Sequence, residues 1–182
     1  MSYHAVNVIS ICIFWIIWIL ALLLIIAYGA VIAFGAPFLP TLKAQRKEAL
    51  DLLGLKPGQT LVDLGSGDGI MLVLAAKRGL KAEGYEINPF LFLYSWLRTR
   101  RYSHQVKIHL KSFWRADLSQ ADGVFVFLIT HYMKRLDRLL SNRQGSKSLK
   151  VVSNSFAIPG RTHSKKHGAM YLYQYPAKGK DG

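Results

Sequence analysis

The chain has 182 residues and carries 24 Lys and Arg against 10 Asp and Glu, a net charge of +14 at pH 7. Its one cysteine, Cys12, excludes an intrachain disulfide, and the length indicates a single soluble domain. Residues 1–42 contain no Asp, Glu, Lys or Arg, so the whole charge lies in residues 43–182, a segment long enough to bury a core.

The first predicted element is a transmembrane helix. Residues 8–34 are almost entirely apolar, and about 20 such residues suffice to cross a bilayer. A signal peptide is disfavoured because the run has no basic flank before it and exceeds the usual apolar core of about 7–15 residues. A buried core helix is disfavoured because the remaining chain could hardly cover a helix that is apolar all round. We therefore expect residues 1–36 to form a membrane anchor.

The flanks of this segment predict its orientation. Lys43, Arg46 and Lys47 follow the span and no charged residue precedes it, so the positive-inside rule places the rest of the chain on the cytoplasmic side. This makes the chain a single-pass membrane protein, in the cytoplasmic membrane if the source is prokaryotic. Prolines at 37 and 40 end the helix and predict a short stiff linker, which leads into an amphipathic helix within residues 37–54.

Residues 55–182 alternate between apolar strand-like runs and helical patterns. We expect helices at 41–53, 70–78, 90–100 and 132–140, and strands at 60–64, 82–86, 106–110, 123–128, 149–153 and 169–175. This alternation predicts an α/β, Rossmann-like sheet that is mostly parallel. The last strand should be antiparallel, because no helix separates it from the one before.

A glycine-rich turn between the first strand and its helix is the strongest candidate site. The sequence Leu-Val-Asp-Leu-Gly-Ser-Gly-Asp-Gly ends at Gly69, and an acidic residue, Glu86, ends the next strand. Such a turn lets backbone approach a ligand, and the acidic residue can accept hydrogen bonds from ribose hydroxyls. The predicted cofactor-binding residues here are Asp63, Gly65, Ser66, Gly67, Asp68, Gly69 and Glu86.

Two ligands compete for this turn. A dinucleotide site would carry G-x-G-x-x-G, whereas here the third glycine comes one residue early and Asp68 stands inside the loop. An acidic residue disfavours a pyrophosphate and favours a cationic sulfonium and amino group. The set is similar to the cofactor signature of seven-strand S-adenosylmethionine-dependent methyltransferases.

Further motifs indicate which group of methyltransferases the chain resembles. They are Gly-Tyr-Glu-Ile-Asn-Pro at 84–89, Phe113-Trp114 followed by Asp-Leu-Ser at 117–119, Phe-Ala-Ile-Pro-Gly at 156–160 and Leu172-Tyr173. Together with the N-terminal helix they resemble the membrane-anchored protein lysine methyltransferases. Mitochondrial members of that family modify the ATP synthase c subunit and the adenine nucleotide translocase, and prokaryotes carry relatives.

The resemblance implies a second group of cofactor contacts, namely Asn88, Ser112, Phe113 and Trp114. Related enzymes often carry an acidic residue at the position of Ser112, which contacts the adenine amino group. The serine is a departure that leaves the adenine resting mainly on Phe113, Trp114 and backbone. Ordinary core packing of the two aromatic residues is the alternative.

The acceptor should meet the loop after the fourth strand, at the carboxyl end of the sheet. His131 could take a proton there and Tyr132 could form a wall, although a surface histidine explains the first equally well. Amino-group methyltransferases of adenine or glutamine carry Asn/Asp-Pro-Pro-Tyr/Phe at this point, and this sequence has nothing similar. His163 and His167 lie among lysines without a carboxylate or cysteine nearby, so no metal site is predicted.

The sequence thus predicts a membrane-anchored, S-adenosylmethionine-dependent methyltransferase that modifies lysine in a membrane-associated protein. A phospholipid or small-molecule N-methyltransferase and a non-catalytic, membrane-tethered cofactor-binding module are the alternatives. The basic surface suits anionic lipid beside the anchor, and it would also suit nucleic acid, which the anchor disfavours. The oligomeric state is not predicted.

Overall fold

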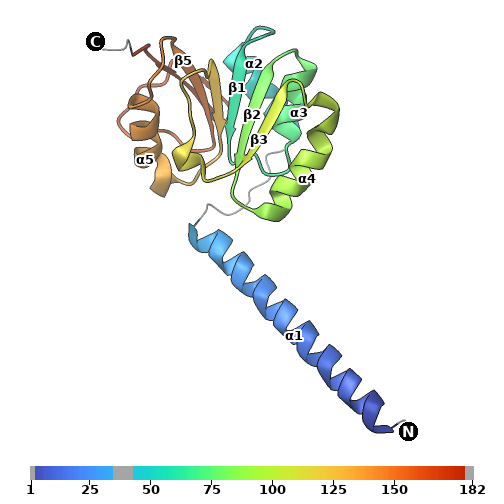
Figure 1. The fold of residues 1–182 in the computed structure, drawn as a ribbon. Helices are drawn as coiled ribbons and strands as arrows, with labels where there is room; N and C mark the ends of the chain where they lie inside the picture. Colours follow the sequence, from blue (N-terminus) through green and yellow to red (C-terminus); the bar gives the residue numbers. More distant parts are fainter. Residues whose placement is uncertain (1–2, 35–42, 179–182) are drawn as a thin grey trace. The chain divides into compact units, whose positions relative to one another are not determined.

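The computed structural model describes residues 3–34 and 43–178. It divides the chain into two compact units, residues 1–37 and 38–182. The first unit contains one helix, α1 (Tyr3–Phe34), drawn in blue in Figure 1. Its stretch Val8–Ile26 is long and apolar enough to cross a membrane by length and composition, and none of it is buried. The predicted proline linker falls in residues 35–42, outside the described residues.

The second unit is built on a seven-stranded sheet of order β3-β2-β1-β4-β5-β7-β6. The strands are β1 (Thr60–Leu64), β2 (Lys81–Glu86), β3 (Val106–Leu110), β4 (Gly123–Val126), β5 (Leu149–Asn154), β6 (Lys165–His167) and β7 (Met170–Tyr175). The first five are parallel to one another, and β7 is antiparallel to both β5 and β6. This confirms the predicted Rossmann-like methyltransferase fold with an antiparallel final strand.

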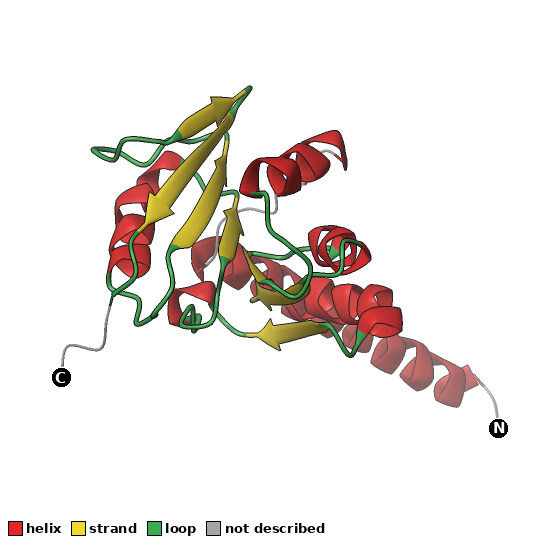
Figure 2. Ribbon diagram, turned by 90° about the horizontal axis from the view of Figure 1, so that it is seen from above, coloured by secondary structure: helices red, strands yellow, loops and turns green. Residues whose placement is uncertain are grey.

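Helices cover both faces of the sheet (Figure 2). The helices α2 (Lys43–Leu53), α3 (Ile70–Lys77) and α4 (Pro89–Thr99) pack side by side, α2 and α4 each against α3. α5 (Thr130–Ser141) lies on the other face, and short 3-10 turns stand at Arg100–Tyr102 and Phe113–Arg115. The core between α2, α3 and the sheet is fully apolar, with residues such as Leu53, Leu72 and Phe125 less than 5% exposed.

Three details differ from the sequence-based expectation. β4 ends at Val126, two residues before the predicted end. β6 lies where the sequence predicts a basic loop, because Lys165, Lys166 and His167 are exposed at the sheet edge and carry no apolar alternation. α5 begins at Thr130, two residues before the predicted start, since Thr130 and His131 already have helical geometry.

Candidate functional site

The glycine turn joins β1 to α3 at the carboxyl end of the sheet, as expected. Gly65, Gly67 and Gly69 all have positive φ (94°, 52° and 73°), so each residue needs the freedom that glycine has. The amides of Gly65 and Ser66 both donate to the carbonyl of Tyr85, each at 3.0 Å. These bonds fix the turn against the end of β2.

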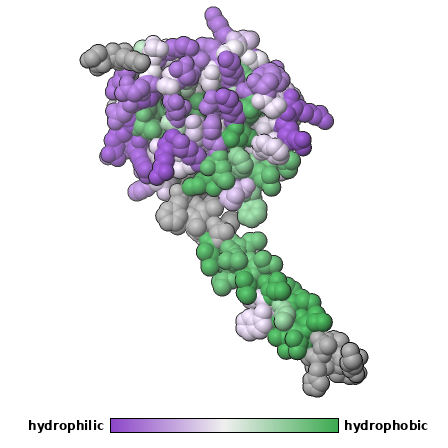
Figure 3. Space-filling view, in the orientation of Figure 1, coloured by the Kyte–Doolittle hydropathy of each residue, from purple (hydrophilic) through white to green (hydrophobic). Residues whose placement is uncertain are grey.

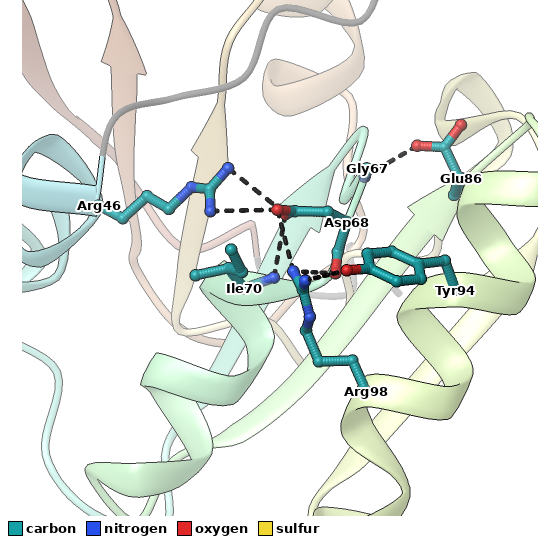
Figure 4. Close-up of polar contacts among 7 residues, drawn as sticks. All are labelled: Arg46, Gly67, Asp68, Ile70, Glu86, Tyr94 and Arg98. Atoms are coloured by element: carbon teal, nitrogen blue, oxygen red, sulfur yellow. Dashed lines mark hydrogen bonds and ion pairs between the residues drawn. The ribbon is translucent and has the colours of Figure 1, made fainter.

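Glu86 holds the same turn from the neighbouring strand (Figure 4). Its Oε2 accepts from the Gly67 amide at 2.8 Å, and its Oε1 accepts from the Asn88 amide at 2.8 Å. The residue is only 8% exposed. Each carboxylate oxygen keeps further acceptor capacity, so Glu86 can support the turn and still accept hydrogen bonds from a ligand.

Asp68 is surrounded by arginines in the structure (Figure 4). Its carboxylate lies 3.4 Å from Arg46 and 3.0 Å from Arg98, and it accepts from the Ile70 amide at 3.2 Å. Arg98 also donates to the Asp68 carbonyl at 2.9 Å and to the Tyr94 hydroxyl at 2.6 Å. Asp68 therefore ties α2 and α4 to the start of α3, and direct contact with a cofactor stays a prediction.

Asp63 lies at the fourth position of β1 and is 3% exposed. Burial raises the pKa of its carboxyl from 3.8 to about 7; Arg46 opposes this shift, and the charges of Glu86 and Asp68 add to it. Three carboxyl groups thus converge at this turn. A cationic ligand would relieve their mutual repulsion.

Arg46 and Arg98 are site residues that sequence patterns do not identify as such. The sequence marks Arg46 only as a charge flanking the span, yet it is 7% exposed and paired with Asp68. Arg98 belongs to the general basic surface on sequence grounds. They lie 22 and 30 residues from Asp68 in the chain, and no local pattern signals a contact at such a separation.

A group of aromatic side chains lies beyond the ends of β3 and β4. The rings of Phe113 and Trp114 are 4.5 Å apart, and Trp114 and Tyr132 are 5.9 Å apart, measured between centroids. His131 stands edge-on to Tyr132 at 5.2 Å. The structure therefore brings together four of the predicted residues, two from the 3-10 turn after β3 and two from the first turn of α5. The Arg135 guanidinium lies 4.1 Å from the Trp114 centroid and occupies one face of that ring.

Asn88 and Ser112 stand at the same edge of the sheet. The Asn88 side chain accepts from the amides of Phe90 and Leu91 at 2.9 and 3.3 Å and so caps α4, with Pro89 in the first turn. Ser112 precedes the turn at Phe113–Arg115 and makes no capping bond there. Contact of either side chain with a ligand stays a prediction.

Three observations test whether these residues fit the predicted cofactor. A Cβ on Gly65 would meet no atom within 4 Å, so the outer side of the turn is open. The buried Ser66 hydroxyl has no partner among the described residues. Glu86 offers a carboxylate at the end of the next strand, where a ribose is bound in folds of this kind. An open glycine edge and a carboxylate that can accept from a ribose suit S-adenosylmethionine, whereas the Ser66 hydroxyl lies against Gly84 inside the fold.

A cavity of about 600 Å³ lies apart from the glycine turn. Its lining includes Trp114, Asp117, Arg135, Arg138 and Arg143, from the turn after β3 and from α5 and the loop that follows it. Three arginines make it a poor environment for the side chain of a lysine. The position of the acceptor beside His131 and Tyr132 stays a prediction.

Comparison with known proteins gives a family match over the site. The profile of the ANTKMT methyltransferase domain matches residues 63–165. The human lysine N-methyltransferase of the ATP synthase c subunit is 32% identical over 145 residues, which cover 78% of this chain and 61% of that protein. The mouse adenine nucleotide translocase lysine N-methyltransferase is 35% identical over 126 residues, 68% of this chain and 54% of that protein. The chain thus spans little more than half the length of these relatives.

Among solved structures, an RNA methyltransferase from Salinibacter ruber in complex with S-adenosyl-L-homocysteine has the same fold. The TM-score is 0.72 with 24% identity, over 79% of this chain and 98% of that one. At this identity the likeness concerns the fold alone. It agrees with the strand order and with the antiparallel β7 described above.

Proposed function

Because the chain belongs to the ANTKMT methyltransferase family, we propose that it is an S-adenosylmethionine-dependent protein-lysine N-methyltransferase. The observation that carries the proposal is the family match across residues 63–165, which contain the open glycine turn and Glu86. The named activity of its relatives is lysine N-methylation of the ATP synthase c subunit or the adenine nucleotide translocase. We propose lysine N-methylation for this chain as well, but we do not propose that it modifies either of these two proteins.

In this proposal, S-adenosylmethionine supplies an electrophilic methyl group when it is bound. Glu86 would accept hydrogen bonds from the ribose, the Gly65–Gly69 turn would hold the amino acid portion, and Phe113 and Trp114 would flank the adenine. Ser112 would offer the adenine a single hydroxyl, at a position where the family resemblance often implies an acidic residue. Asp68 is already paired with Arg46 and Arg98, so Glu86, together with Asp63 when it is ionised, would supply the negative charge that a sulfonium and an ammonium group require.

The acceptor side of the site lies at His131 and Tyr132. Methyl transfer requires a neutral amine aligned with the sulfonium, so the lysine ammonium must lose a proton before its nitrogen lone pair can form the new N–C bond. The methyl–sulfur bond of the cofactor would break in the same displacement, and S-adenosylhomocysteine would be the leaving group. We propose that Tyr132 forms a wall of the lysine channel, where partial desolvation lowers the pKa of the amine. His131 is exposed beside Tyr132 and can accept the released proton.

We further propose that α1 anchors the enzyme in a membrane. The stretch Val8–Ile26 is apolar and unburied, and basic residues follow it only on the C-terminal side. The orientation expected from those charges places the catalytic unit on the cytoplasmic side. An anchored enzyme would meet membrane-associated acceptors by preference, in line with the acceptors named for its relatives.

A matched pair on β2 tests the cofactor site. Glu86→Gln should weaken S-adenosylmethionine binding at least about tenfold, because the amide nitrogen cannot accept from either backbone amide or from a ribose hydroxyl. Glu83→Gln, on the same strand but paired with His109 at 3.3 Å, should bind normally. Calorimetric titration of both variants provides the measurement. Equal affinities would contradict the assignment of Glu86.

Transfer of a labelled methyl group tests the reaction. The full chain in native membranes, supplied with methyl-labelled S-adenosylmethionine, should label a protease-sensitive band whose hydrolysate contains methyl-lysine. Label in the lipid extract would support a phospholipid N-methyltransferase in its place. Binding of the cofactor without any transfer, across several membrane sources, would support the non-catalytic alternative.

A further inference from the structure

Most apolar residues of α4 are exposed, which is unusual for a helix of a soluble domain, although Leu91 and Phe92 are partly buried. Phe90, Leu93, Tyr94, Trp96 and Leu97 are between 47% and 66% exposed. The side chains that α4 buries are Ser95 and Thr99, at 0% and 4%. Amphipathic helices normally turn their apolar stripe toward the core, so this reversal requires an explanation.

The packing of α4 explains why its inner side is small and polar. A Cβ on Gly69 would overlap the Ser95 hydroxyl, so α4 approaches the glycine turn very closely at this point. The Thr99 hydroxyl folds back onto the Ser95 carbonyl at 2.9 Å. Larger residues would not fit against the turn. The outward apolar residues contribute little to this packing, although the Tyr94 hydroxyl accepts from Arg98 at 2.6 Å, and their exposed surface is available to another contact.

We call these outward residues of one helix the α4 outer face. It comprises Phe90, Leu93, Tyr94, Trp96 and Leu97, and the half-exposed Ile87 and Leu110 continue it along the ends of β2 and β3. Figure 3 shows apolar surface gathered at this lower edge of the domain, where the start of α4 lies in Figure 1. An area of this extent marks a contact with a protein or a membrane.

The charges around the α4 outer face indicate whether it contacts a protein or a membrane. From Ile87 to Ala116 the sequence has no Asp or Glu, and its six basic residues are Arg98, Arg100, Arg101, Lys107, Lys111 and Arg115. Arg100 and Arg101 are exposed at the end of the helix, and the Arg100 guanidinium lies 5.3 Å from the Trp96 ring. Aromatic and aliphatic residues beside basic ones are typical of helices that lie in the interface of an anionic bilayer.

A second copy of the chain is a poorer occupant. Symmetric pairing through α4 would bring two acid-free, basic borders together, which costs energy at every like-charge contact. A bilayer has no such conflict, and the chain already carries the unburied apolar helix α1. Only residues 35–42 separate α1 from α2, and eight residues reach at most about 29 Å, so a tether of this length would keep the domain near the membrane surface.

We propose that the α4 outer face docks on the surface of an anionic lipid bilayer as a second membrane contact. The proposal rests on the membrane anchoring proposed for α1 and adds an orientation to it. Because α4 packs against the glycine turn and Asn88 caps it directly after Glu86, docking holds the cofactor site beside the lipid surface. An acceptor lysine at the membrane surface would then lie within reach of the site.

A depth measurement on the full chain tests this docking. In a Cys12→Ser background, Leu93→Cys carries an environment-sensitive fluorophore in one protein and Ser146→Cys carries it in a matched control. Ser146 is also exposed but precedes β5, away from α4 in the sheet order. Both are reconstituted through α1 into vesicles of phosphatidylcholine and phosphatidylserine. We expect blue-shifted emission and quenching by shallow nitroxide lipids that is several-fold stronger at position 93 than at 146.

Equal quenching at the two positions would overturn the proposal. Shielding of position 93 that appears in detergent micelles and grows with protein concentration would also overturn it, in favour of a second copy. Binding of S-adenosylmethionine is measured on the same samples, and α1 insertion is measured by resistance to alkaline extraction. Loss of cofactor binding with retained quenching would contradict the proposed function alone, whereas retained extraction resistance without quenching would contradict the docking alone.

Discussion

At the scale of single residues, the buried carboxyl of Asp63 couples the site to pH. Burial raises its pKa to about 7 in the folded chain, against about 3.9 when unfolded. Between these values the folded protein binds a proton that the unfolded chain does not, so stability falls as pH rises from about 4 to 7. The penalty is complete above pH 7 and absent below about pH 4.

Replacing this carboxyl should remove the effect. The free energy of unfolding of Asp63→Asn, minus that of the original chain, should rise with pH between 5 and 7, with a slope of at most about 1.4 kcal/mol per pH unit. Urea unfolding of both proteins in the same detergent, at several pH values, gives the difference. A difference that stays flat across this range would show that Asp63 titrates in the folded chain as it does in the unfolded one.

The glycine turn allows a second residue-scale prediction. Gly65→Ala and Gly160→Ala both place a Cβ at positive φ (94° and 77°) with no atom within 4 Å, so each should destabilise the fold by about 1–3 kcal/mol through backbone strain alone. Only Gly65→Ala should also weaken S-adenosylmethionine binding, because its methyl group fills the open side of the turn. Equal affinity in the two variants would place the cofactor elsewhere.

At the scale of elements, Asp137 joins α5 to β7. Its Oδ1 accepts from the Arg161 Nε at 2.6 Å and from the Tyr175 hydroxyl at 2.7 Å. Burial raises the pKa of Tyr175, which is 2% exposed, so its hydroxyl remains a donor. Asp137→Ala leaves that donor without its acceptor and should cost about 1–3 kcal/mol of stability with cofactor affinity unchanged.

The control for this prediction is Asp51→Ala. Asp51 pairs with Arg78 at a similar distance, 2.6 Å, but its side chain is 67% exposed, and exposed pairs contribute between 0 and about 1 kcal/mol. Denaturant unfolding of the two variants provides the comparison. A loss at Asp137 no larger than the loss at Asp51 would mean that α5 is held to β7 by apolar packing alone.

The helices and strands also show which parts of the fold sequence patterns can predict. Apolar periodicity and glycine positions predicted six of the seven strands, the four helices of the domain and the antiparallel end of the sheet, because buried strands and caps leave local signals. β6 left none, since its three side chains are all exposed. For α4 the period predicted the helix, but the same period fits an apolar face turned inward or outward. Only the close approach of Gly69 to Ser95 decides which.

The residues of the candidate site also divide into those that sequence patterns predict and those that they do not. The glycine turn and Glu86 could be predicted from neighbours in sequence and strand order, and the aromatic pair from the family resemblance, while their contact with a cofactor stays a prediction. The two arginines on Asp68 could not, because α2 and α4 contribute them through packing across α3. Contacts of this kind depend on how helices dock, which no spacing within one segment specifies.

At the scale of the whole molecule, the proposed anchor fixes the domain to one side of a membrane. That side decides which acceptor proteins the domain can reach. Lys43, Arg46 and Lys47 follow the span, and Arg46 is also paired with Asp68 inside the fold. The orientation signal can therefore be changed at Lys43 and Lys47 without disturbing the site. In inverted bacterial membrane vesicles, added protease should digest the domain of the original chain, and in right-side-out vesicles it should not.

Reversing the difference in charge between the two ends of the span should make this orientation less favoured. Lys43→Gln and Lys47→Gln combined with Asn7→Lys remove two positive charges after the span and add one before it, so the fraction protected in inverted vesicles should rise. Lys77→Gln with Lys107→Gln removes two charges far from the span and should leave protection unchanged. Since the proposed docking of α4 requires the domain and anionic lipid on the same side, an inverted domain would also lose the electrostatic part of that contact. A protected fraction that does not change with these charges would contradict the cytoplasmic placement of the site.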